Sequence, residues 1–271
     1  REFVVRFTVP IFVLFSLYDA RPESIAAIAP TAGAFVLMTG VLFAIGWAAS
    51  RMVREMPRRT AVHACVTFGN YGWMGLGVAG ALLGEEGAQR VVYFILLWWP
   101  VFYGVGLTIG WIHTRGRRGG VPLRRTVAVA APPIVAMVVG LALNLGAVPL
   151  PALAQQVLRP FGRMTVPLIL LSVGILLDLR RLQSAAGPAL VVSAITLVVG
   201  PLVGWGLAAV LARDRVTFQA IILEGAMPVA TLTPVLEENY AMDSDLVSSA
   251  IVMSTALSLV TIPVVAVLLP G

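Results

Sequence analysis

The chain has almost none of the side chains on which metal sites, disulfide frameworks and most catalytic centres depend. Its 271 residues include one cysteine, Cys65, and two histidines, His63 and His113. A single cysteine excludes an intramolecular disulfide and a cysteine-rich metal cage. The sequence contains no HExxH motif, no paired-Asp metal motif and no glycine-rich phosphate loop. We therefore expect a protein that is not an enzyme, without catalytic residues, metal ligands or a cofactor.

Charge is also scarce. Charged residues make up 12% of the chain, whereas soluble domains contain about 25%. Hydrophobic residues make up 59%, and the mean hydropathy is +0.93. The apolar residues come in repeated stretches of about 20, the length that crosses a hydrocarbon layer of ~30 Å. This distribution predicts an all-α integral membrane protein that lies in the lipid bilayer.

The apolar stretches predict nine membrane spans and one interfacial segment. Residues 147–159 are too short and too proline-rich at their start to cross the bilayer, so we expect them at its surface. The predicted spans are 3–18, 25–50, 60–83, 88–112, 123–146, 160–177, 185–212, 216–238 and 245–269.

All 19 basic residues are arginines, and lysine is absent. The net charge of +6 does not indicate a nucleic-acid partner, because the arginines collect in short connectors between apolar stretches. Thirteen lie on the side that holds the chain start and six on the other side. Since positive residues stay in the cytoplasm, we expect a multi-pass protein of the cell inner (plasma) membrane with its C-terminus outside.

The chain contains an internal repeat. Residues Arg6–Pro10 (RFTVP) recur as Arg163–Pro167 (RMTVP), an offset of 157 residues. At this offset the third span falls on the eighth, and Glu85-Glu86 falls near Asp243. We infer an inverted repeat of five helices, ten in a parent chain, of which about nine are visible because the first copy lacks its first helix here. Inverted repeats are typical of secondary transporters.

The third and eighth spans are poor membrane helices at matching places of the two copies. The third has five glycines within residues 68–80, and the eighth carries Pro228 and Pro234. Backbone freed by such residues is tolerated in a membrane where it is buried in protein or lines a wet cavity. We therefore expect two discontinuous crossing helices with a binding site between them. The alternative is close helix packing through small residues.

Such a crossing suits an anion, because two half-helices present unpaired amides and positive partial charge to one point. No lysine and no arginine near the bilayer midplane is available to bind a carboxylate, so helix ends and amide donors would have to bind it. The predicted substrate-binding residues are Asn70, Tyr71, Gly72, Gly77, Pro228, Thr231, Thr233 and Pro234.

Glu224 is the one acidic residue well inside an apolar segment, which makes it a functional hypothesis. Proton coupling, cation coordination, pairing with Arg163 and a structural salt bridge all remain open for it. His63 and His113 lie at the ends of spans, and we expect them at the membrane interface rather than at a ligand. Trp98 and Trp99 fit an aromatic belt or packing.

Two stretches resemble a known family. FGNYGWMGLGVAGALLG (68–84) resembles the fourth helix of the auxin efflux carrier family, and residues 225–263, from GAMPVATLTP to VTIP, resemble its last two helices. The chain departs from that family at Gly77, where a proline is frequent, and at Thr231-Leu-Thr233, where many members have an asparagine.

The resemblance implies ten helices and a fold similar to bile-acid transporters and sodium/proton antiporters. It implies a scaffold part (1–19 and 123–178), which can form a homodimer, and a mobile, elevator-type transport part (25–113 and 185–269). Family substrates are malate, malonate or auxin, all of which are carboxylates. We therefore expect a secondary transporter that moves a small organic anion by alternating access. A membrane sensor or binding module on the same fold is the alternative. Substrate, transport direction and coupling to Na⁺ or H⁺ stay open.

Overall fold

The computed structural model describes residues 4–20, 22–114, 123–165, 167–168, 171, 185–237 and 242–269. In these residues every regular element is a helix, apart from one isolated β-bridge. This confirms the all-α fold that the composition predicts. Most of the sixth predicted span (160–177) and the end of the scaffold part lie outside the described residues.

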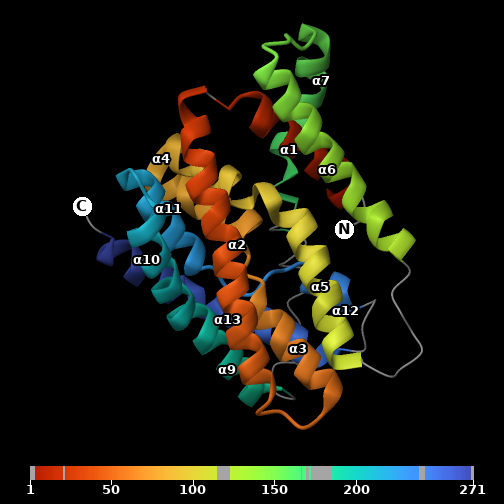
Figure 1. The fold of residues 1–271 in the computed structure, drawn as a ribbon, viewed down its shortest axis with the longest axis vertical. Helices are drawn as coiled ribbons and strands as arrows, with labels where there is room; N and C mark the ends of the chain where they lie inside the picture. The colour runs from red at the N-terminus through yellow and green to blue at the C-terminus, as the bar shows by residue number, and fades with distance from the viewer. Residues whose placement is uncertain are drawn as a thin grey trace.

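The helices follow one another in the order shown in Figure 1. Short π- or 3₁₀-helical turns at Val4–Thr8, Tyr71–Gly75 (η2), Ile95–Leu97 and Ile195–Val199 join or extend them. The α-helices are α1 (Val9–Tyr18), α2 (Pro22–Ser50), α3 (Met56–Thr67), α4 (Leu76–Phe94), α5 (Trp98–Thr114), α6 (Leu123–Leu145), α7 (Ala152–Arg163), α9 (Ala186–Ala194), α10 (Gly200–Leu211), α11 (Arg215–Gly225), α12 (Thr233–Glu237) and α13 (Ser244–Leu268).

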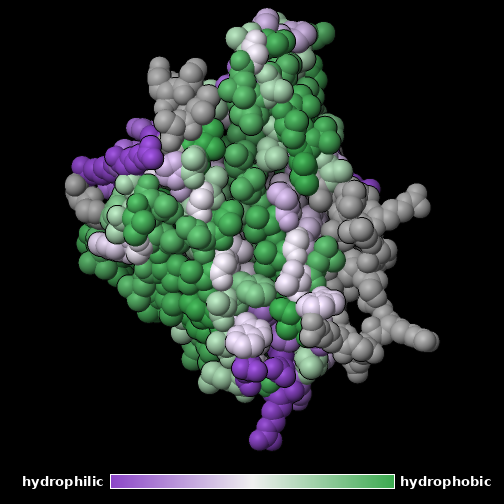
Figure 2. Space-filling view, viewed as in Figure 1, coloured by the Kyte–Doolittle hydropathy of each residue, from purple (hydrophilic) through white to green (hydrophobic). Residues whose placement is uncertain are grey.

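Within the described residues, four helical stretches are long and apolar enough to cross a membrane: Ile28–Ser50, Tyr71–His113, Ala186–Leu211 and Ser244–Leu268. Large apolar side chains face outward on these stretches, such as Val210 at 82% exposure. Figure 2 shows hydrophobic residues over the flank of the molecule, with hydrophilic residues gathered below α2 and α3 and beside α4 and α11. An apolar flank between polar ends is the surface that a bilayer requires, so the chain is a multi-pass membrane protein.

The helices pack in two sets. α1 lies against α6 and α7 at the upper right of Figure 1, while α2 to α5 pack with α9 to α13. α1 and α6 approach closely at Gly140, where an added Cβ would lie 3.1 Å from the Cα of Leu14. The division into a scaffold part and a transport part, and the movement of one part against the other, stay predictions.

The connector predicted at residues 84–87 corresponds to a kink at Gly84, where two helical segments of α4 meet. α4 runs through Glu85 and Glu86, and the chain there departs from helical geometry at Gly84 alone, with φ 71° and ψ −161°. Glycine adopts a positive φ without a steric penalty, so one residue suffices to redirect the helix. The predicted interfacial segment at 147–159 corresponds to α7, which begins directly after Pro151.

Glycines allow α10 and α11 to lie in backbone contact. A Cβ added at Gly204 would lie 2.9 Å from the carbonyl oxygen of Ile221 and 3.2 Å from the Cα of Ile222. A Cβ added at Gly225 would lie 2.6 Å from the carbonyl oxygen of Gly200. Because the opposing atoms belong to the backbone, the two helices must separate if either glycine gains a side chain.

We expect Gly204→Ala to lower the free energy of unfolding by about 1–3 kcal/mol, the cost of overpacking a tight contact. Gly206→Ala on the same helix is the matched control, since nothing lies within 4 Å of its Cβ position. Alanine there should leave stability unchanged or raise it through its higher helix propensity. Thermal unfolding in detergent measures both variants. Equal midpoints for the two would contradict the packing described.

Candidate functional site: the crossing of two broken helices

The first broken helix consists of α3, an extended break at residues 68–70, and α4. α3 ends at Thr67, and Phe68 follows with φ −113° and ψ 110°. The chain then re-enters helix through the η2 turn, in which the amides of Met74 and Gly75 both donate to the carbonyl of Asn70, at 3.2 and 3.1 Å. The glycine-rich stretch therefore interrupts the helix for about three residues and restarts it in a wide turn.

The second broken helix consists of α11, a break at residues 226–232, and α12. Pro228 has no N–H to donate to the carbonyl of Glu224, four residues earlier, so the helix cannot continue. That carbonyl accepts from the amide of Met227 instead, at 3.2 Å. Thr233 restarts the helix, with its amide donating to the carbonyl of Ala230 at 3.1 Å.

The two breaks meet and pair with each other. Gly69 and Val229 form an antiparallel β-bridge. On its two sides the Asn70 amide donates to the Pro228 carbonyl at 2.7 Å, and the Ala230 amide donates to the Phe68 carbonyl at 2.8 Å. The Val229 amide donates to Ser254 Oγ on α13, at 3.1 Å. The broken helices thus cross in opposite chain directions, as the inverted repeat predicts, and each break satisfies backbone groups of the other.

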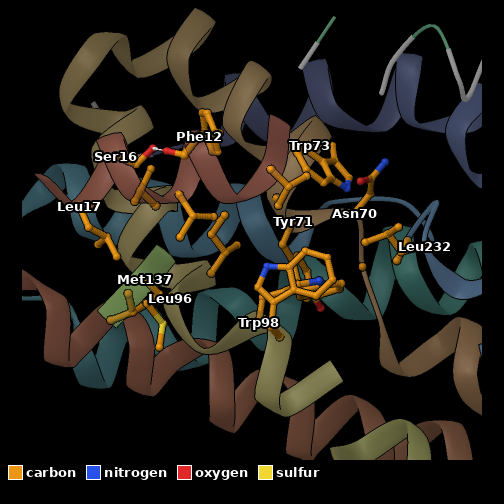
Figure 3. A pocket seen from close by; sticks show the side chains of 18 residues that line it. Phe12, Ser16, Leu17, Asn70, Tyr71, Trp73, Leu96, Trp98, Met137 and Leu232 are labelled. Carbon is orange, nitrogen blue, oxygen red and sulfur yellow. Dashed lines mark hydrogen bonds between the residues drawn. The ribbon is translucent and has the colours of Figure 1, made fainter. Parts of the chain in front are cut away.

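A pocket with about 660 Å³ of empty volume, its open part included, lies between this crossing and helices α1 and α6. Figure 3 shows Asn70 and Leu232 at one end, Leu17 and Met137 at the other, and Trp98 between them. The wall is mostly aromatic and aliphatic. Its other labelled side chains are Phe12, Ser16, Tyr71, Trp73 and Leu96.

Polar groups are few in this pocket. Asn70 is 4% exposed, and its Oδ1 has no hydrogen-bond partner within the described parts of the chain. Ser16 lines the pocket too, but its hydroxyl donates to the carbonyl of Phe12 at 2.8 Å. The Tyr71 hydroxyl in the same wall also has no hydrogen-bond partner among the described residues. Asn70 Nδ2 and the Tyr71 hydroxyl can donate to an anionic ligand group, whereas Asn70 Oδ1 can only accept.

An aromatic cluster fixes the pocket wall. The Tyr71 ring packs edge-on against Phe35, Phe94 and Trp98, with centroids 6.0, 5.4 and 5.8 Å away. Trp98 stacks on Phe102 at 5.2 Å. The sequence did not identify Trp98 and Trp99 as pocket residues, since a pair of tryptophans in an apolar stretch fits a membrane belt equally well. Both are almost fully buried.

The predicted substrate-binding residues divide into two groups. Asn70, Tyr71 and Gly72 line the pocket. Pro228 contributes its carbonyl to the pairing, and Thr233 is buried with its hydroxyl donating to the carbonyl of Ala230 at 2.8 Å. The second break contributes Ala230 and Leu232 to the pocket wall. Pro228 and Thr233 do not line the pocket, and neither do the other predicted residues, Gly77, Thr231 and Pro234. A role in substrate binding stays a prediction for all of them.

Glu224 is fully buried near the end of α11 and faces Gly75. A Cβ at Gly75 would lie 2.6 Å from its Oε2, so the glycine provides the space for the carboxyl group. Neither carboxyl oxygen has a hydrogen-bond partner among the residues described. The pairing of Glu224 with Arg163 is therefore wrong. Arg163 is exposed at the end of α7, in the set of helices that packs with α1.

The two histidines are buried against each other. His63 on α3 is 0% exposed and His113 on α5 is 6% exposed, and His63 Nδ1 lies 2.9 Å from His113 Nε2. His63 Nε2 lies 3.1 Å from the carbonyl oxygen of Phe43, which can only accept a proton. In the neutral pair His63 therefore carries its proton on Nε2, and His113 donates to His63 Nδ1.

Ion pairs join the start of each broken helix, far from its break, to a helix of the other repeat. At the start of α3, Arg58 Nε donates to Asp243 Oδ2 at 2.8 Å, and Asp243 also caps α13 through the Leu246 amide. At the start of α11, Asp214 lies 3.7 Å from Arg90 of α4. The two contacts lie at corresponding places of the two repeats, with the acidic and basic partners exchanged. Each repeat therefore anchors the other.

A helical membrane protein with two crossed, broken helices and a pocket at the crossing belongs to the class of multi-pass membrane transporters. The chain belongs to the membrane transport protein family, whose model matches residues 1–118 and 124–266. This confirms the auxin efflux carrier family that the sequence motifs resemble, and it places the chain among transporters and not among enzymes.

Two relatives carry transporter names. The chain is 32% identical over 274 residues to an uncharacterized transporter of Methanothermobacter thermautotrophicus, covering 98% of this chain and 87% of the relative. It is 26% identical over 200 residues to the uncharacterized transporter MJ1031 of Methanocaldococcus jannaschii, covering 72% of this chain and 63% of that protein.

Asp214 provides a test of the ion pairs. Burial raises the pKa of its carboxyl, but hydrogen bonds from the Thr217 amide and hydroxyl and the charge of Arg90 outweigh this and hold the pKa below its ordinary 3.8. A lowered pKa stabilises the fold above pH 3.8, and this stabilisation is lost as the pH falls through the folded-state value.

We expect Asp214→Ala to cost about 1 kcal/mol at pH 7, the loss of an N-cap. Asp214→Asn keeps a capping oxygen and should cost less, through the lost charge alone. Thermal unfolding from pH 7 downwards measures both. The difference in unfolding midpoint between wild type and Asp214→Asn should vanish in acid. A difference that persists there would contradict the lowered pKa of Asp214.

Proposed function

We propose that the protein is a secondary transporter of small organic anions that binds the anionic group of its substrate at the crossing. The observation that supports this most is the pairing of the two breaks next to a pocket whose wall includes Asn70, Tyr71 and Gly72. Unwound backbone within a membrane domain is tolerated where it lines a cavity, and such breaks at equivalent places of two repeats are where transporters bind substrate.

The composition of the pocket favours a monocarboxylate with an apolar body. Trp73, Trp98, Trp99 and Met137 offer apolar surface, and Asn70 is one amide at one end of the pocket. A second carboxylate, as in malate or malonate, would be buried among these mostly apolar side chains, which is costly. A planar or aliphatic body would lie against this apolar wall, with its carboxylate at Asn70.

Transport by alternating access would move this site between the two faces of the membrane. The pocket has one wall from α1 and α6 and the other from the crossing, so the substrate lies between the two sets of helices. A sliding or rocking movement of one set against the other would then expose the anion to each side in turn. This mechanism rests on the packing of the helices and on family membership.

Exchange of labelled benzenesulfonate into proteoliposomes tests transport. The sulfonate stays ionised and therefore does not cross lipid unaided, while its shape resembles an aromatic carboxylate. We expect protein-dependent exchange, and we expect phenylacetate to compete with it better than malonate does. Binding without exchange would contradict transport and favour a membrane sensor. Better competition by malonate would contradict the monocarboxylate preference.

Two variants of the pocket test the position of the anion. Asn70→Leu removes a hydrogen bond to a charged group, and the resulting loss of about 1.5–3 kcal/mol corresponds to roughly 10- to 100-fold weaker binding. Ser16→Ala is the matched control, because its hydroxyl is already bonded to Phe12. We expect this variant to bind like the wild type. Binding that tolerates Asn70→Leu but not Ser16→Ala would place the anion elsewhere.

A further inference from the structure

Glu224 is the buried ionisable group that anion binding alone does not use. It lies one residue before the end of α11, and its main-chain carbonyl takes part in the break that follows. Its carboxyl group lies beside Gly75, at the start of α4. It therefore contacts both broken helices, close to the pocket but outside its wall.

The surroundings of Glu224 favour a neutral carboxyl. It is 0% exposed, and in the described structure no group donates a hydrogen bond to either oxygen. An ionised carboxylate in such a place loses its hydration without compensation, so the group binds a proton or acquires a counter-charge.

No arginine or second carboxylate faces it from the elements that pack against α11. From η2 the titratable residue is Tyr71, whose phenol is close enough to interact electrostatically. α10 and residues 28–50 of α2 carry no titratable side chain. Glu85, Glu86, Arg90 and Tyr93 of α4 lie beyond the Gly84 kink, and Asp245 lies at the start of α13. Arg90 contacts Asp214, ten residues before Glu224 and thus about 15 Å along α11.

The surroundings of Glu224 suit a bound proton better than a bound metal cation. A bound Na⁺ needs several oxygen ligands, and broken helices often supply them as freed carbonyls. Of the carbonyls in the two breaks, those of Phe68, Asn70, Glu224, Pro228 and Ala230 already accept at least one amide hydrogen bond, and each such bond occupies one of the two lone pairs of the oxygen. A proton needs one oxygen of the carboxyl group and no further ligand.

We propose that the Glu224 carboxyl is a proton-binding site that is occupied whenever the anion is bound, so that the anion crosses the membrane together with a proton. This rests on the proposed function. An ionised Glu224 and a bound anion would place two negative charges in one poorly hydrated region, and like charges disfavour ionisation. Anion binding and protonation therefore strengthen each other, and by linkage the effect is reciprocal.

Infrared spectroscopy of the protein in lipid tests the proton directly and without a substrate. The carbonyl stretch of a protonated carboxylic acid should be present at neutral pH in the wild type and absent in Glu224→Gln. Glu55→Gln is the control, because the Glu55 side chain is 69% exposed and should leave the band unchanged. A wild type without a Glu224-dependent band, or one that loses it when Na⁺ is added, would overturn the proposal.

Binding of phenylacetate measured by calorimetry across pH tests the coupling. Affinity should fall above the pH at which the infrared band disappears, by at most about tenfold per pH unit because one proton is linked. In Glu224→Gln, which resembles the protonated form, affinity should not depend on pH. A pH dependence shared by wild type and variant, or none in the wild type, would overturn the coupling. If the wild type does not bind phenylacetate, the proposed substrate class fails, while the infrared result still decides whether Glu224 is protonated.

Discussion

The structure depends on the need of every backbone amide and carbonyl inside a membrane for a partner. Two helices stop in the middle of the molecule, and each break exposes groups that lipid cannot satisfy. The short antiparallel bridge between Gly69 and Val229 solves this by pairing one break with the other. Because neither break is satisfied alone, the two halves of the repeat must be assembled together for either to be stable.

This pairing positions the other features of the site. It holds Asn70 at one end of an apolar pocket and places Tyr71 in the pocket wall. It also brings Gly75 at the start of α4 against the carboxyl of Glu224 on α11. The proposed anion site and a buried carboxyl thus lie close together, and this proximity is what would link proton binding to anion binding.

The sequence predicts the parts of this arrangement that depend on local chemistry. The length of the last apolar stretch predicted both ends of α13 to within one residue. The glycines and prolines predicted both breaks. The sequence does not predict which remote side chains meet. Glu224 was a reasonable partner for Arg163, and His63 had no visible partner, because such pairs depend on how helices pack. The sequence also predicted the change of direction at Gly84, but not that a single glycine makes it while Glu85 and Glu86 stay helical.

Amide hydrogen exchange at Asn70 and Ala230 tests the pairing of the breaks most directly. Both amides lie beside a pocket, and if they are bonded across the crossing they should exchange as slowly as the helical amides of α11. The exposed connector at residues 54–55 gives the fast reference in the same sample. Exchange at Asn70 and Ala230 as fast as in that connector would show that the two broken helices do not pair, and the account of the site would be wrong.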